Sequence, residues 1–150
     1  MEKIVKDASE VSLEQVRSYW NANPVAASAV PHPPGSPAFF EFYDRLRERN
    51  ASVESSYALH EYKRFSGKMV LDIGCGNGYG VDLTPTAVDL CRKRFTLMEQ
   101  KGDFRVGNAE SLPFDDNTFD CVTSIGVLHH TPDTPKSITK SSAPSNRAVG

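Results

Sequence analysis

Apolar residues recur at helical spacing in the first third of the chain. Ser12 and Gln15 have the spacing of a capping box, which marks the start of a helix. The predicted helix carries its apolar residues on one face: Leu13, Val16, Tyr19 and Trp20. Residues 24–37 hold five of the ten prolines and therefore predict a loop. A second helix is expected to start with Ser36 as its N-cap, and a third to cover residues 53–64.

The pattern changes to short apolar runs from residue 69 onward. Residues 69–73 form such a run, closed by glycines, as expected of a buried parallel strand. Thr84 and Pro85 then provide an N-cap and a first-turn proline for a helix. Residues 104–106 and 119–125 predict two further strands. Strands that alternate with helices predict an α/β fold, here preceded by a helical N-terminal region.

Three segments of different character follow from these patterns. Residues 1–66 are predicted to form a helical N-terminal region, and residues 67–140 an α/β domain. Residues 141–150 are polar, small and aperiodic, which predicts a disordered tail.

Composition narrows the classes of partner. The chain is 39% hydrophobic and 24% charged, as is usual for a globular domain. The net charge of −2 provides no large basic field, which argues against nucleic acid as the main partner. No apolar run approaches the ~18 residues of a membrane span, and the first residues do not resemble a signal peptide. The sequence therefore predicts a cytoplasmic protein without a membrane partner.

The cysteines and histidines do not have metal-ligand spacing. Cys75, Cys91 and Cys121 are widely separated and form no CxxC pair, so they predict reduced thiols and neither a disulfide framework nor a zinc site. His129 and His130 are adjacent, and neighbouring residues of a helix do not share a face. No metal site is therefore expected.

A glycine loop follows the first predicted strand. In the segment DIGCGNG, residues 72–78, Gly74, Gly76 and Gly78 let the backbone turn sharply and approach a ligand closely. Taken alone, the loop also fits a structural turn or another nucleotide site. Asp72 sharpens the interpretation, because a carboxylate suits a ligand with an amino group and a sulfonium better than a pyrophosphate.

Four ordered segments resemble the class I S-adenosylmethionine-dependent methyltransferases, most closely the type-11 group. Residues 70–78 (VLDIGCGNG) resemble motif I of this family, and residues 80–85 (GVDLTP) resemble the end of its second strand. Residues 107–114 (GNAESLPF) resemble its adenine-binding loop, and residues 119–130 (FDCVTSIGVLHH) its fourth strand. Together the resemblance covers about residues 68–138 and implies a Rossmann-like parallel sheet that binds S-adenosylmethionine.

The resemblance also implies roles for particular residues. Asp82 would hold the ribose hydroxyls and Leu83 would pack on the adenine. Asn108 and the backbone that follows it would hold the adenine edge, and Ile125 would lie near the methionine part. The implied cofactor-binding set is Asp72, Gly74, Cys75, Gly76, Gly78, Asp82, Leu83, Asn108, Ala109, Glu110 and Ile125.

The reaction implied is methyl transfer to a small-molecule acceptor, and the sequence identifies no catalytic residue. In the family the segment before the glycine loop commonly covers the substrate, so the resemblance implies that residues 1–66 form a cap or lid over a partial S-adenosylmethionine-binding domain of residues 67–140. Trp20 of this lid, with His129 and His130, is a candidate for facing the acceptor. For the two histidines, a structural or mouth-lining role is weighed against that of a general base. Cys75 is interpreted as a small loop residue, since no base stands beside it in the sequence.

The sequence departs from the family between the glycine loop and Asp82. A parallel crossover needs about a dozen residues or more, and here Gly78 is followed almost at once by Gly80 and Val81. We therefore expect the second strand to have lost its helix and most of its length. The sheet should be incomplete, with three or four short strands, and its open edges would favour self-association. The shortened chain is expected to have little activity.

Two other functions remain to be weighed against methyl transfer. One is a non-catalytic cofactor-binding or interaction fragment of a methyltransferase. The other is a nicotinamide dehydrogenase, which Asp72 disfavours and which would require glycine where Val81 stands.

Overall fold

The computed structural model describes residues 11–24, 28–50, 64–75 and 79–142. Four parallel strands form one sheet in the order β3-β2-β1-β4. They are β1 (Val70–Ile73), β2 (Tyr79–Asp82), β3 (Asp103–Val106) and β4 (Cys121–Ser124). The helices are α1 (Leu13–Ala22), α2 (Pro37–Asn50), α4 (Pro85–Leu97) and α5 (Thr134–Ser142), with a short 3-10 helix η2 (Leu128–His130). The predicted α/β fold with a parallel sheet is confirmed.

The helix starts follow from local sequence. Ser12 accepts from the Gln15 backbone N–H while Gln15 Oε1 accepts from the Ser12 N–H, so both sides of the capping box are made. Thr84 caps α4 by accepting from the Ala87 N–H at 3.3 Å. Ser36 likewise accepts from the Phe39 N–H at the start of α2. These starts are confirmed, whereas the helix predicted at residues 53–64 falls almost wholly outside the described residues.

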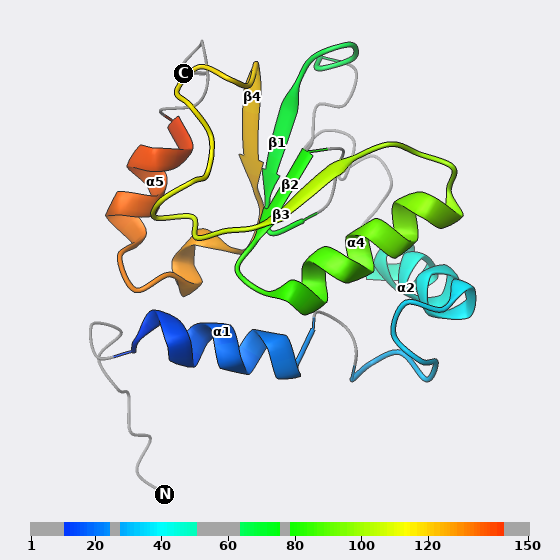
Figure 1. Ribbon diagram of the computed structural model, residues 1–150. Coiled ribbons are helices and arrows are strands. Elements are labelled where there is room, and N and C mark those ends of the chain that lie inside the picture. Colours follow the sequence, from blue (N-terminus) through cyan, green and yellow to red (C-terminus); the bar gives the residue numbers. More distant parts are fainter. Residues whose placement is uncertain (1–10, 25–27, 51–63, 76–78, 143–150) are drawn as a thin grey trace, which may run out of the picture.

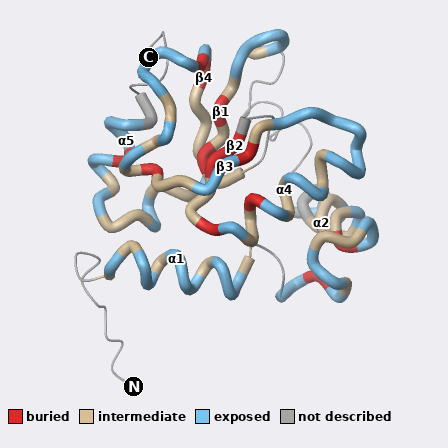
Figure 2. The backbone as a smooth tube through the Cα atoms, in the orientation of Figure 1, coloured by how far each residue is buried: buried red, intermediate tan, exposed pale blue. Residues whose placement is uncertain are grey.

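The sheet is covered on both faces. Leu71, Ile73 and Val81 alternate along β1 and β2 and pack with Ala109 and Phe119 into the main core. Figure 2 shows buried positions gathered where the strands lie side by side. Toward α4, Phe95 meets Phe104 of β3 edge-on, with ring centroids 4.7 Å apart. The helix α2 packs on α4, where Arg94 and Asp44 form an ion pair at 2.7 Å. Among the described helices, none has the length and hydropathy of a membrane span.

The second strand corrects an expectation from the sequence. β2 is present and pairs in parallel with β1, Leu71 opposite Tyr79, although only residues 74–78 separate the two strands. The register explains how this is possible. Because β2 begins level with the second residue of β1, the chain has to return only about 7 Å along the sheet and about 5 Å across it. Six residue steps can span roughly 20 Å, so a short loop replaces the crossover helix.

Smaller differences concern boundaries and exposure. The last strand is Cys121–Ser124, shorter than the predicted residues 119–125. Helix α5 continues to Ser142 and so includes the first two residues of the predicted tail, whereas residues 143–150 lie outside the described residues. Tyr19, expected on the inward face of α1, is 60% exposed, because that helix turns only a narrow stripe toward the sheet.

Candidate cofactor site

A cavity of about 130 Å³ lies at the carboxyl ends of β1 and β2. Its inner wall consists of Ile73, Gly74 and residues 81–84, and its sides are residues 107–109 and the segment that leads into η2. Helix α1 supplies a further wall, and Figure 1 shows this helix running across the end of the sheet toward α4. Ligands of open α/β sheets bind at this carboxyl end.

Gly74 has the backbone conformation and the space that only glycine tolerates. Its φ is +98°, and a Cβ placed there would lie 2.3 Å from Cγ2 of Val127. Its N–H donates to the Val81 carbonyl at 2.8 Å, which ties the start of the glycine loop to β2. The loop therefore begins with its backbone bare toward the cavity, as close approach to a ligand requires.

Asp82 is the acidic residue of the cavity, and its carboxylate is held in place by the residue that caps α4. Asp82 Oδ1 accepts from the Thr84 N–H at 2.8 Å and from the Thr84 hydroxyl at 2.9 Å. Burial raises the pKa of Asp82 above its ordinary value, and the two hydrogen bonds from Thr84 oppose this shift. An anion that is half removed from water gains most from a ligand that donates hydrogen bonds, as ribose hydroxyls do.

The third wall is a turn whose side chains bond mainly to the protein. Asn108 lines the cavity, and its Oδ1 accepts from the Glu110 N–H at 2.9 Å. Glu110 Oε1 accepts from the Asp133 N–H at 3.0 Å, so this carboxylate anchors the start of α5 and does not line the cavity. The turn lies close to β2 at Gly107, where an added Cβ would lie only 2.6 Å from Val81 Cγ2. The absence of a side chain at Gly107 permits this approach.

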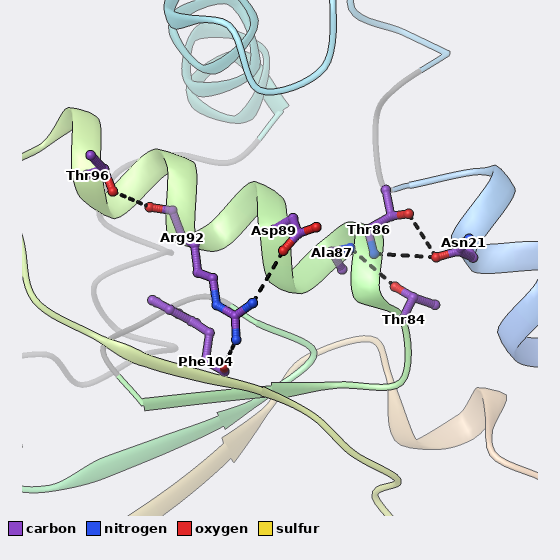
Figure 3. Close-up of polar contacts among 8 residues, drawn as sticks. All are labelled: Asn21, Thr84, Thr86, Ala87, Asp89, Arg92, Thr96 and Phe104. Atoms are coloured by element: carbon purple, nitrogen blue, oxygen red, sulfur yellow. Dashed lines mark hydrogen bonds and ion pairs between the residues drawn. The ribbon is translucent and has the colours of Figure 1, made fainter.

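Helix α1 closes the cavity with apolar side chains. Leu13, Val16 and Trp20 all line it, yet no residue of α1 is buried. Figure 3 shows the polar contact that holds this helix: Asn21 Oδ1 accepts from the Thr86 hydroxyl at 2.8 Å and from the Thr86 N–H at 3.4 Å. A helix with one shallow apolar stripe and one polar contact is weakly docked.

At the mouth of the cavity, α1 meets η2 through aromatic rings. The centroids of Trp20 and His130 lie 5.2 Å apart at 61°, and those of His129 and His130 lie 3.9 Å apart. Burial, and then the neighbouring His129, lower the pKa of His130 below its ordinary 6.5. At neutral pH the ring that faces the cavity is therefore an uncharged imidazole.

Because Trp20 is the chain's single tryptophan, its fluorescence should report the charge of His130. We expect quenching as the pH falls, with a midpoint below 6.5, because an imidazolium beside an indole perturbs its excited state. His130→Gln should abolish this transition. His129→Gln should move the midpoint upward, since a like charge is removed. An unchanged titration in His130→Gln would show that another group is being observed.

The structure brings some of the predicted residues together and separates others. Of the predicted set, the residues that line the cavity are Gly74, Asp82, Leu83, Asn108, Ala109, Trp20 and His130. The residues outside its lining are Asp72, Cys75, Glu110, Ile125 and His129. Asp72 instead accepts from the Thr123 hydroxyl at 3.0 Å, and Ile125 is 48% exposed. Gly76 and Gly78 lie outside the described residues.

Sequence reasoning missed several lining residues. Thr84 was predicted only as a helix cap and Val127 not at all, although both line the cavity. Leu13 and Val16 were predicted to share a face with Trp20, and the spacing of that face was the available signal. Where the face docks is a tertiary property that the spacing does not contain.

The fold and this cavity define a Rossmann-like protein with a ligand site at the carboxyl end of its sheet. Residues 67–142 match the family model of the methyltransferase domain, which is half of the chain. The chain belongs to this methyltransferase family, as the four sequence motifs predicted. S-adenosylmethionine is the cofactor that this membership supports.

Curated relatives share the same part of the chain. The chain is 36% identical over 86 residues to a phthiotriol/phenolphthiotriol dimycocerosates methyltransferase of Mycobacterium leprae, covering 47% of this chain and 31% of that protein. It is 32% identical over 78 residues to a fatty-acid O-methyltransferase of Mycolicibacterium smegmatis, covering 42% and 28%. The chain thus spans about a third of the length of the relatives it matches.

Solved structures show that the fold extends beyond the matched residues. Magnesium protoporphyrin IX methyltransferase of Synechocystis, solved with bound SAM, superimposes with a TM-score of 0.63 at 20% identity, covering 97% of this chain and 76% of that one. The cyclase SpnF gives the same TM-score at 18% identity, covering 90% and 57%. Both similarities concern the fold alone, and a cyclase among them illustrates that one fold serves several chemistries.

The residues present suit the cofactor, but the size of the cavity does not. A bare backbone at Gly74, a carboxylate at Asp82 and an apolar Leu83 fit an amino acid joined to a nucleoside. Pockets for small ligands usually measure about 300–1,000 Å³, well above the cavity found here. Because α1 forms one wall without burying any residue, it is the element whose movement would enlarge the site.

Proposed function

We propose that this chain is the S-adenosylmethionine-binding unit of a methyltransferase that acts on a small-molecule acceptor. The observation that carries the proposal is the convergence of Gly74, Asp82 and Asn108, from three separate motifs, on one cavity. When bound, the cofactor supplies an electrophilic methyl group, and the protein contributes orientation and exclusion of water.

The roles proposed for the chain's own residues follow from their positions. Asp82 accepts hydrogen bonds from the ribose, Leu83 packs on the adenine, and Asn108 with Ala109 borders the adenine edge. Trp20 and His130 border the acceptor, for which we propose an apolar molecule because α1 adds only apolar side chains to the cavity. The acceptors named for the relatives, a dimycocerosate lipid and a fatty acid, agree with this choice.

Some predictions about partners and place remain proposals. We propose a cytoplasmic location because the wide spacing of the three cysteines suits reduced thiols. We propose no nucleic-acid partner because the net charge of −2 provides no large basic field. The second candidate function, a non-catalytic cofactor-binding fragment, is favoured by the small cavity. Both candidate functions bind the same cofactor, and only the first includes catalytic turnover.

Calorimetry with S-adenosylmethionine, S-adenosylhomocysteine and NAD tests the proposal. We expect both S-adenosyl ligands to bind and NAD not to bind. Binding of NAD alone, or of none of the three, would contradict the assignment of the site.

Removing the charge of Asp82 should separate its support of Thr84 from its binding of a ligand. Asp82→Asn keeps an oxygen that can accept from Thr84 but loses charge-assisted bonds to a ligand. We expect S-adenosylhomocysteine binding to weaken by about 1.5–3 kcal/mol, roughly 10- to 150-fold in Kd. Asp82→Ala should weaken binding equally and also destabilise α4, since Thr84 loses its acceptor. Undiminished affinity in both variants would place the ribose elsewhere.

The raised pKa of Asp82 gives the same variant a pH signature. A carboxyl whose folded pKa lies above its unfolded value contributes stability at low pH, and this contribution is lost as the pH rises through the folded pKa. The Asn variant has no titrating carboxyl at this position and so does not lose this stability. Urea unfolding should therefore show the free energy of unfolding of Asp82→Asn rising relative to that of the parent chain as the pH rises from below 3.8 toward neutrality.

Weakening the contact between α1 and α4 should expose Trp20. Thr86→Val removes the hydroxyl that donates to Asn21 and should weaken docking by up to about 1 kcal/mol, or about fivefold. Acrylamide quenching of Trp20 should increase accordingly. Thr96→Val is the matched control, because the Thr96 hydroxyl donates only within α4, to the Arg92 carbonyl. Equal quenching in both variants would mean that Asn21 does not hold α1.

A further inference from the structure

The fold brings together two cysteines that the sequence separates. Cys75 follows Gly74 in the glycine loop, and Cys91 lies in the middle of α4. The Cys91 thiol donates to the Cys75 carbonyl at 3.5 Å. Both residues are free thiols and half-buried, whereas Cys121 is buried in β4.

The position of the Cys75 side chain also points toward α4. A Cβ on Gly80 of β2 would lie 3.5 Å from Cys75 Sγ and 2.9 Å from the ring of Phe104, which itself packs on Phe95 of α4. The Cys75 sulfur therefore lies between the sheet and α4, on the side where Cys91 lies. The absence of a side chain at Gly80 leaves the room that the sulfur occupies.

We propose that Cys75 and Cys91 are a redox pair, which closes to an intramolecular disulfide by exchange with a small-molecule disulfide. Cys91 Sγ lies 3.5 Å from the backbone carbonyl oxygen of Cys75, so the two residues are in contact. A disulfide between them requires Cβ atoms about 3.8 Å apart. The bond would tie the glycine loop to α4. Only three residues stand between Cys75 and β2, too few for a crossover helix, so a covalent link to α4 would support the loop.

The exchange takes two balanced steps. One protein thiolate attacks the small disulfide, forms a mixed disulfide, and releases one small thiolate, which takes up a proton. The other protein sulfur then attacks the mixed disulfide at the protein's sulfur, and the second small thiol leaves. The two cysteines lose two hydrogens, and the small disulfide is reduced to two thiols.

The surroundings of Cys75 affect the reactivity of its thiol. The hydrogen bond with Cys91, then burial, and then the negative charges nearby raise the pKa of the Cys75 thiol. A raised pKa lowers the fraction of Cys75 that is present as the attacking thiolate.

Equilibration of the reduced chain with defined ratios of glutathione and glutathione disulfide tests this proposal. We expect the intact mass to fall by two hydrogens and a digest to contain one linked pair, Cys75 with Cys91. The ratio of linked to unlinked chain gives the effective concentration of the pair. It should be at least about tenfold higher in the folded chain than in concentrated urea, where only chain length brings the thiols together.

Two serine variants serve as controls. Cys121→Ser should form the same linked pair as the parent, whereas Cys91→Ser should form no intramolecular bond. The proposal is overturned if Cys121 is linked as often as Cys91, if the folded chain ends as mixed glutathione adducts, or if folding does not raise the effective concentration. None of these readings depends on binding of a methyl donor, so the proposed function is tested separately.

Discussion

Replacing Gly74 with alanine is expected to destabilise the folded chain by about 2–4 kcal/mol. The positive φ of +98° contributes about 1–2 kcal/mol for any residue with a Cβ. The remainder comes from overlap, because the new methyl group would lie 2.3 Å from Val127 Cγ2. Domains have total stabilities of about 5–15 kcal/mol, so such a loss is large. Urea unfolding followed by circular dichroism measures it.

Matched variants separate backbone strain from overlap. Gly67 also has a positive φ, +71°, but nothing lies within 4 Å of a Cβ there, so Gly67→Ala should lose only about 1 kcal/mol. Val127→Ala removes the branch that Gly74→Ala would meet. The double variant should therefore be less destabilised than the two single changes predict together. Simple additivity would show that strain, and not overlap, is what excludes a side chain at Gly74.

The purified 150-residue chain is expected to show little or no methyl transfer, about 10³-fold or more below a complete relative. The cavity of about 130 Å³ is too small to hold a donor and an acceptor in line while α1 is docked. Formation of S-adenosylhomocysteine with a panel of fatty acids and long-chain alcohols measures turnover. The fatty-acid O-methyltransferase assayed in parallel verifies the panel. Robust multiple turnover would contradict the expectation and would mean that α1 moves aside readily.

The open edges of the sheet predict self-association of the chain. Within the described ranges, β3 and β4 each pair with one strand only, and an unpaired edge is a template for association. We therefore expect sedimentation to show concentration-dependent self-association. A monomer at all concentrations would indicate that both edges are covered in solution.

Features that depend on neighbouring residues could be predicted from the sequence. The helix starts at Ser12, Ser36 and Thr84 follow from side chains that bond to backbone groups three residues away. The glycine loop and its motif partners identified the family, because each motif keeps its own local order. Helix starts and motifs can therefore be predicted from the sequence even where the chain between them is shortened.

Only the tertiary structure decided how these parts meet. The register of β2 on β1 lets the five residues 74–78 connect two paired strands, although the number of residues had predicted that β2 would lose most of its length. Side-chain direction brings the Glu110 carboxylate to the Asp133 N–H at the start of α5 and leaves Ile125 48% exposed, although both residues belong to matching motifs. The approach of Cys91 to Cys75 joins two elements through packing. Sequence determined which elements form, because their energies are local; packing determined which residues share a site, because contacts across the fold depend on register and docking.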